Sequence, residues 1–201
     1  ESRLVNRLFQ PTLSFVHDNA LFGLHGPVMG SRWSLSLARG LPLSGSSLDR
    51  WNAVVDVRKY LPLSRRTSLA AHFTYAHSGG DDPRAFVIGG PWTLRGYRYY
   101  DFQTVPNLAG TRFVLGRLEY RLPLVDYLIF GWPGRWGLAG IGGAVFADAG
   151  MAWSDDARLD DLHSNYGLGL RARALGLPLR FDWAWRFDGG DMFHFSIGPN
   201  F

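Results

Sequence analysis

The sequence has no cysteine, a single lysine and only two glutamates in 201 residues. Without cysteine, the chain can form no disulfide framework, thiolate metal site or thiol nucleophile. Long apolar runs are also missing, since no stretch approaches the roughly 18 uninterrupted residues of a membrane-spanning helix. Glu1 to Arg7 lack the apolar core of a signal peptide, so we expect a mature chain or a piece of a longer one.

The basic residues are almost all arginine. Arginine supplies 20 of the 21 basic side chains, and Glu119 is the only glutamate after Glu1. A solvated surface normally mixes lysine with glutamate, whereas arginine suits fixed pairs with carboxylates or phosphates. The pI near 9.7 would permit nucleic-acid binding, but no basic cluster or recognition helix accompanies it. We therefore expect no nucleic-acid partner.

Apolar and polar residues alternate with period two along most of the chain, and helical periodicity is hard to find. The pattern predicts one all-β domain over residues 1–201, an antiparallel meander without a linker. Between its strands we expect turns or loops at 19–31, 41–50, 154–163 and 176–178, and an apolar interruption at 123–137 that suits an interface. We expect about nine strands: Thr12–Asp18, Trp33–Ala38, Trp51–Tyr60, Thr67–Ser78, Val114–Leu122, Ile141–Trp153, Asn165–Arg173, Leu179–Phe187 and Phe193–Phe201.

One face of these strands is apolar and the other collects arginine and aspartate. A soluble sandwich would also have one apolar face, but two features favour a transmembrane β-barrel. Rings such as Trp33, Trp51 and Trp153 stand near strand ends, as in interfacial girdles, and the strands are long enough to cross a bilayer. Because single-chain bacterial barrels usually have an even number of strands, nine suggests that further strands lie upstream.

A long aromatic loop, from about residue 79 to residue 110, interrupts the strand pattern. Within it, Gly89 to Phe102 combine two glycines and a proline with too many rings for a solvated loop, so this stretch must fold in against something. Arg95 stands in the middle with Gly96 directly after it. The glycine permits a tight turn while the guanidinium reaches for a carboxylate.

Several motifs along the chain resemble the bacterial surface antigen family, the barrel shared by BamA, TamA and the two-partner-secretion transporters. They are the Gly-Gly-x-x-Thr-Leu-Arg-Gly-Tyr run at 89–97, Leu-Glu-Tyr at 118–120, Phe-Ala-Asp-Ala-Gly at 146–150, Gly-Leu-Gly-Leu-Arg at 167–171 and a last strand ending in Phe201. The resemblance covers nearly the whole chain. It implies a sixteen-stranded barrel preceded by periplasmic POTRA domains, of which this chain would supply the C-terminal portion.

The resemblance also assigns roles to particular residues. The inward loop motif would be Gly89, Gly90, Leu94, Arg95, Gly96 and Tyr97, with Arg95 paired to Glu119 and Asp148 beside it. The alternation independently puts both acidic residues on the polar face. Such a pair would hold the loop in the lumen as a plug or latch. The family often has Phe where this chain has Tyr97.

The resemblance implies a second role, for the last strand. In the family this strand carries the signal that the assembly machinery recognises by edge pairing. The matching residues are Phe193, Phe195, Ile197, Gly198 and Phe201. The same aromatic residues would also be accounted for as lipid-facing side chains, and the residues alone leave both readings open.

The sequence shows no catalytic or cofactor site. There is no nucleophile elbow or catalytic acid pair, and the six histidines share no metal-ligand spacing. Asp155-Asp156 with Asp160-Asp161 could bind a cation, although a solvated loop explains them as well. Arg171, Arg173, Arg180 and Arg186 could line an ion path or pair with Asp182 and Asp56. We expect no enzyme activity, no metal and no cofactor.

Three classes of function fit these expectations. The first is an outer-membrane barrel of the BamA/TamA type, which inserts, assembles or translocates other proteins. The second is a barrel that anchors an upstream soluble domain such as a lipase, and the third is a passive porin, against which the inward loop argues. All three belong in the bacterial outer membrane, with lipid as a partner. The first adds client proteins and possible accessory assembly subunits.

Overall fold

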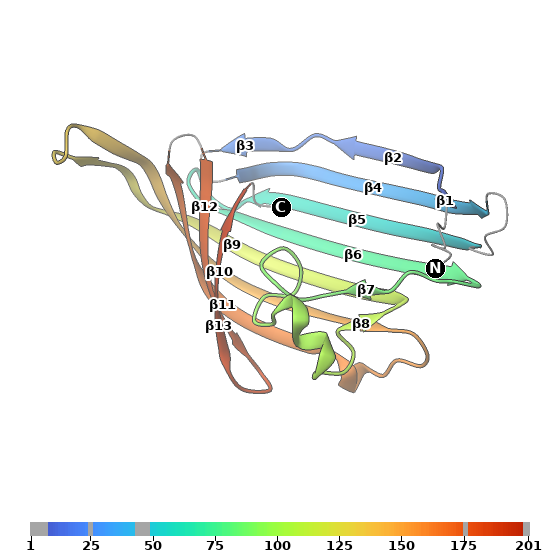
Figure 1. Ribbon diagram of the computed structural model, residues 1–201. Helices are drawn as coiled ribbons and strands as arrows, with labels where there is room; N and C mark the ends of the chain where they lie inside the picture. Colours follow the sequence, from blue (N-terminus) through green and yellow to red (C-terminus); the bar gives the residue numbers. More distant parts are fainter. Residues whose placement is uncertain (1–7, 24–25, 43–48, 175–176, 199–201) are drawn as a thin grey trace, which may run out of the picture.

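The computed structural model describes residues 8–23, 26–42, 49–174 and 177–198, which form one large antiparallel sheet (Figure 1). Its order is β1-β4-β5-β6-β9-β10-β11-β12-β13, with β2 and β3 also paired to β4. The strands are β1 (Leu8–Phe9), β2 (Thr12–Asp18), β3 (Leu21–Gly23), β4 (Gly26–Pro42), β5 (Arg50–Pro62), β6 (Ser68–Gly80), β9 (Arg112–Phe130), β10 (Trp136–Trp153), β11 (His163–Ala174), β12 (Leu177–Arg186) and β13 (Asp191–Ile197).

The all-β antiparallel meander predicted from the alternation is confirmed. β1, β2 and β3 lie one after another along β4 and together make one interrupted edge. When β1, β2 and β3 are counted as one strand, the described residues form the nine strands expected from the sequence. The sheet curves like part of a cylinder wall (Figure 1). Among these residues β13 pairs only with β12, so the two edges do not meet and the curve stays open.

The two faces of the sheet differ as the alternation predicts. Large apolar side chains are exposed on the outer face, for example Leu168 (55% exposed) and Phe193 (58%). The inner face is buried although it is polar, because it is covered by the loop and by its own ion pairs. The buried polar residues on strands include Asn52, Ser68, His72, Thr74, Ser78, Arg117, Glu119, Arg121, Asp148, Asn165, Arg171, Arg180, Asp182, His194 and Ser196.

Two of the predicted breaks between strands are wrong in extent. The apolar segment 123–137 is no interruption, because β9 runs through Pro123 to Phe130 and β10 begins at Trp136. Pro123 pairs with Gly142 where the register shifts, and a bulge is where a residue lacking an N–H is tolerated. The predicted turn at 19–31 shrinks because β3 and β4 pair within it.

The predicted acidic link keeps its place, whereas Leu177 and Pro178 of the predicted turn at 176–178 belong to β12. An acidic loop with one 3₁₀ turn (Leu159–Asp161) joins β10 to β11. Residues 43–48 of the predicted loop at 41–50, and Gly176 of the predicted turn before β12, lie outside the described residues. No helix in the described ranges is long and apolar enough to cross a membrane.

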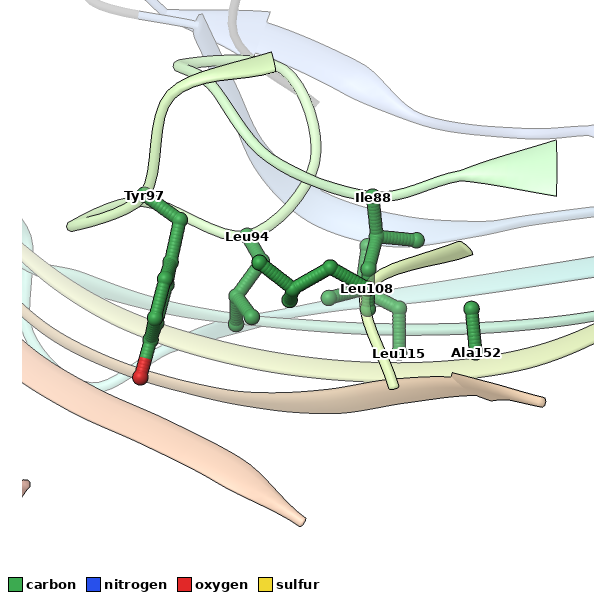
Figure 2. Close-up of a cluster of buried hydrophobic side chains, with 6 residues drawn as sticks. All are labelled: Ile88, Leu94, Tyr97, Leu108, Leu115 and Ala152. Carbon is green, nitrogen blue, oxygen red and sulfur yellow. The ribbon is translucent and has the colours of Figure 1, made fainter. Parts of the chain in front are cut away.

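The long loop between β6 and β9 lies on the inner face of the sheet (Figure 1). Two short strands, β7 (Phe86–Val87) and β8 (Ala109–Gly110), pair to close its base, and a 3₁₀ turn spans Tyr99–Gln103. Its apolar side chains pack onto Leu115 of β9 and Ala152 of β10, which anchors the loop to the wall. The buried cluster drawn in Figure 2 consists of Ile88, Leu94, Tyr97, Leu108, Leu115 and Ala152.

Candidate functional site

The turn that carries Arg95 is held by glycine geometry and backbone hydrogen bonds. The N–H of Gly90 donates to the carbonyl oxygens of Tyr97 (2.7 Å) and Leu94 (3.2 Å). Gly89, Gly90 and Gly96 all have positive φ, a conformation that costs other residues free energy. At Gly96 (φ +84°) an added Cβ would lie 3.2 Å from Cγ of Arg186. The turn therefore presses its tip against the wall of the sheet.

Arg95 points into that wall and is fully buried (0% exposed). Its Nε donates to Oδ2 of Asp148 at 2.6 Å and its Nη2 donates to Oδ1 at 2.7 Å, a two-pronged pair. Its Nη1 donates to Oε2 of Glu119 at 2.9 Å. The two predicted carboxylates thus meet the predicted arginine, with Asp148 rather than Glu119 as the bidentate partner.

Three residues that the sequence analysis did not assign complete the seat of Arg95. The ring of Phe146 lies 3.4 Å from the guanidinium carbon, a cation–π contact. Asn165 donates from Nδ2 to the carbonyl oxygen of Arg95 (2.5 Å), and the N–H of Gly96 donates to Nε2 of His194 (3.0 Å). The loop tip is therefore bound to strands β9, β10, β11 and β13.

The space for Phe146 comes from a glycine on the next strand. Phe146 pairs with Gly167 of β11, and a Cβ added to Gly167 would lie 2.3 Å from Cζ of Phe146. Both residues belong to motifs that resemble the surface antigen family. Alternation puts Phe146 on the same face as Asp148, but only the structure shows that Gly167 makes room for its ring.

The carboxylates of this site are shared among several arginines. Glu119 also accepts from Nε of Arg121 (2.9 Å) and Nη2 of Arg171 (3.0 Å). Asp182 accepts from Nη1 of Arg171 (2.6 Å) and Nη2 of Arg180 (3.1 Å). Asp182 Oδ2 lies 3.8 Å from Nη1 of Arg95, and Nε of Arg117 lies 3.5 Å from Asp148. We call these residues the luminal ion network: Arg95, Arg117, Arg121, Arg171, Arg180, Glu119, Asp148 and Asp182.

The luminal ion network joins five arginines to three carboxylates, so its formal charge is +2 among the described residues. Burial opposes a charge on Arg95, but the carboxylates of Asp148, Glu119 and Asp182 outweigh it and raise the pKa of this guanidinium above its ordinary value. Arg95 therefore stays charged at any physiological pH, and breaking its pairs would strand buried charges.

Tyr97 has polar partners of its own. Its hydroxyl donates to Oδ2 of Asp188 (3.0 Å) and lies 3.3 Å from Nδ1 of His163. Arg186 lies over its ring. Burial, followed by the Asp188 carboxylate, raises the pKa of the Tyr97 hydroxyl. A phenylalanine here could make none of the hydroxyl contacts.

A second polar cluster lies on the same inner face, on β5 and β6. Asp56 accepts from Nε of Arg58 (2.6 Å) and lies 2.7 Å from Nε2 of His72 and 3.2 Å from the Thr74 hydroxyl. We call these four residues the β5–β6 cluster. Its members come from two neighbouring strands, and the hydrogen bonds of Asp56 stay within those strands.

The other predicted site residues lie as follows. Arg171 and Arg180 pair with Asp182, as the pairing alternative predicts. Arg186 instead lies near Asp188, Asp56 pairs with Arg58, and Arg173 is exposed. Asp155, Asp156 and Asp160 are exposed. No group of three or more metal-type side chains in the described ranges is placed to hold a metal ion.

The last strand carries most of the residues of the predicted terminal signal. Phe193, Phe195 and Ile197 are exposed on the outer face of β13. Gly198 (φ +141°) lies under Trp92 of the loop, where an added Cβ would be 2.9 Å from the indole. Phe201 lies outside the described residues.

Comparisons with known proteins agree with this architecture. The profile of the Omp85 superfamily domain matches residues 12–201. Among solved structures, the chain is similar to BamA from Haemophilus ducreyi lacking POTRA domains 1–3, with a TM-score of 0.70 and 19% identity. The match covers 94% of this chain but 41% of that one, so the chain spans less than half of its length. A search of the curated proteins found no match.

Proposed function

The chain belongs to the Omp85 superfamily, and from that premise we propose that it acts in the insertion, assembly or translocation of other proteins at the outer membrane. As an Omp85-type outer-membrane protein it carries an outer face suited to lipid and an inner face suited to a polar lumen. The work would be done without nucleotide or cofactor, by opening of the complete barrel between its first and last strands.

The observation that carries the proposal is the seat of Arg95. A loop that is buried at its tip and tied to β9, β10, β11 and β13 lies against the inner face, where a porin needs open water. Withdrawal of the tip would break all of these ties together, which is what a conformational latch requires. This supports a machine that changes shape over a passive pore.

The test uses the complete natural protein reconstituted in phospholipid vesicles. An unfolded eight-stranded outer-membrane barrel is added from urea, and its folding is followed by the mobility shift on gels without heating. We expect folding at least about tenfold faster than in empty vesicles. Arg95→Ala should remove most of the acceleration, whereas Arg98→Ala, an exposed change three residues away in the same loop, should keep it.

Two results would contradict the proposal. Folding as slow as in empty vesicles would leave an anchor barrel for an upstream domain. Steady ion conductance from the unaltered protein, insensitive to Arg95→Ala, would favour a porin.

A further inference from the structure

The hairpin between β9 and β10 projects beyond the rest of the sheet (Figure 1). β6 accompanies β9 only as far as Arg121, and β11 accompanies β10 only as far as Ala139. In the described part of the chain no third strand pairs with residues 124–138, which we call the projecting ribbon. An isolated two-stranded hairpin is marginally stable in water, so something is expected to cover it.

The projecting ribbon continues the outer face of the barrel. Tyr120 and Val145 are paired and exposed on that face. Past the register shift, Val125 pairs with Ile141, which stands four residues from Val145 on the same strand. The outer apolar row therefore runs on without a break into the projecting ribbon.

The row becomes more exposed toward the end of the projecting ribbon. Val125 is 39% exposed, Tyr127 58% and Ile129 62%, and Trp132 in the turn is 84% exposed. Tyrosine and tryptophan at the end of an apolar row are the side chains of a membrane–water interface. The end of the row thus carries amphipathic rings at Tyr127 and Trp132, on either side of the aliphatic Ile129.

The depth of the projecting ribbon agrees with this composition. Ala139 pairs with both Tyr127 and Arg173, and β11 ends one residue later at Ala174, so Tyr127 is level with the end of β11. From there to Phe130 is about 10 Å along the strand, or about 8 Å along the membrane normal at a tilt of about 40°. A headgroup layer is about 5–8 Å thick.

Charges around the projecting ribbon suit lipid phosphates. Arg135 is exposed in its turn, and Arg65 and Arg66 are exposed in the turn between β5 and β6. Asp126, an acidic residue on the ribbon, is already paired with Arg66. The links at this end of the barrel are short and the long loops lie at the other, so this end faces the periplasm.

We propose that the projecting ribbon lies in the headgroup layer of the periplasmic leaflet as an interfacial anchor. Tyr127, Ile129 and Trp132 enter the lipid boundary, and Arg65 and Arg135 contact phospholipid phosphates. The occupant of this surface is lipid rather than a periplasmic protein. The inference does not depend on the proposed function, since an anchor barrel or a porin would keep the same contact.

The test exploits the absence of cysteine from residues 1–201. Single-cysteine variants W132C and I129C of the complete natural protein, with any cysteine outside this chain replaced by serine, are labelled with the environment-sensitive dye NBD. They are reconstituted in vesicles of phosphatidylethanolamine and phosphatidylglycerol, 3:1. L170C on the outer face and D156C in the acidic loop serve as the lipid-facing and solvated controls.

We expect a nitroxide on the lipid headgroup to quench both ribbon labels at least about twofold. A nitroxide deep in the acyl chain should quench L170C more than W132C, and D156C should keep the emission of the dye in water. The double change Tyr127→Ser with Trp132→Ser should reduce quenching at I129C by more than half while the folded mobility on gels is unchanged.

Either of two results would overturn the inference. Ribbon labels with the emission of water would place the hairpin in the periplasm. Labels shifted to the blue but unquenched by either lipid would mean that protein covers the hairpin.

Discussion

Two clusters of ion pairs line the inner face of the same sheet, and they are built differently. In the luminal ion network every member is at most 5% exposed, and its central residue comes from a loop 53 residues away from its main partner. The β5–β6 cluster joins side chains from two adjacent strands, and its Asp56 and Arg58 remain in part accessible. The luminal ion network binds a loop to the sheet, whereas the β5–β6 cluster links two neighbouring strands within the sheet.

This difference separates two uses of the same chemistry. Neighbouring strands already share backbone hydrogen bonds, so the β5–β6 cluster adds little to the position of its strands. The loop has no ladder to hold it against the sheet, and its place depends on side chains. Changes in the luminal ion network should therefore move the loop, while changes in the β5–β6 cluster should not.

The largest effect is expected for Arg95→Ala. The change strands Asp148 and Glu119 with one cation fewer, and breaking a buried pair from one side costs about 3–5 kcal/mol. Cleavage of residues 79–110 by proteinase K should rise at least about tenfold. Arg95→Lys keeps the charge but not the bidentate geometry and should lie between. Unchanged cleavage in both variants would show that the loop is not latched by this residue.

Asp148→Asn should come next. It removes the bidentate acceptor but leaves Arg95 with Glu119, and with Asp182 at 3.8 Å. The network would then hold five arginines against two carboxylates, so we expect a loss of about 2–4 kcal/mol. Loop cleavage should increase, by less than in Arg95→Ala. A larger increase than in Arg95→Ala would mean that Asp148 serves something other than Arg95.

Asp56→Asn tests the β5–β6 cluster in the same way. It weakens the contacts of Arg58, His72 and Thr74, for which we expect about 1–2 kcal/mol in urea unfolding. Loop cleavage should stay at the level of the unaltered protein, because the hydrogen-bond partners of Asp56 all lie on β5 and β6. Increased cleavage would show that the two clusters act as one.

Tyr97→Phe should have the smallest effect. It removes the hydroxyl that donates to Asp188, whose side chain is half exposed and can turn to water. The ring keeps its place in the buried cluster, so a loss below about 1 kcal/mol is expected, with loop cleavage within twofold. Thermal unfolding of both proteins in the same detergent measures the difference, and a loss above about 2 kcal/mol would count against this account.

Much of the fold can be predicted from the sequence, because the alternation of apolar and polar residues along each strand shows which side chains share a face. Period-two alternation predicts nine strands and puts Glu119 and Asp148 on the inner face. The breaks were less accurate, since Pro123 ordinarily marks the end of a strand and here sits at a bulge. The alternation also does not show how far a hairpin such as the projecting ribbon extends beyond its neighbouring strands.

The candidate site could be predicted from the sequence only in part. The pairing of Arg95 with Glu119 and Asp148 followed from motif resemblance together with the face of each residue. Which carboxylate would be bidentate, and that Phe146 would lie under the guanidinium, depend on register between strands distant in sequence. Asp182 appeared only as one possible partner of several arginines. Its central place needs the curvature of the sheet, which brings β12 toward β9.

Gly96 and Trp92 both touch the end of the chain: the N–H of Gly96 donates to His194 of β13, and Trp92 lies over Gly198. The free energy of seating the loop and the free energy of pairing β13 are therefore coupled. By reciprocity, if the seated loop stabilises the pairing of β13, a paired β13 stabilises the seated loop by the same free energy. Peeling of β13 would then destabilise the seated loop by that amount.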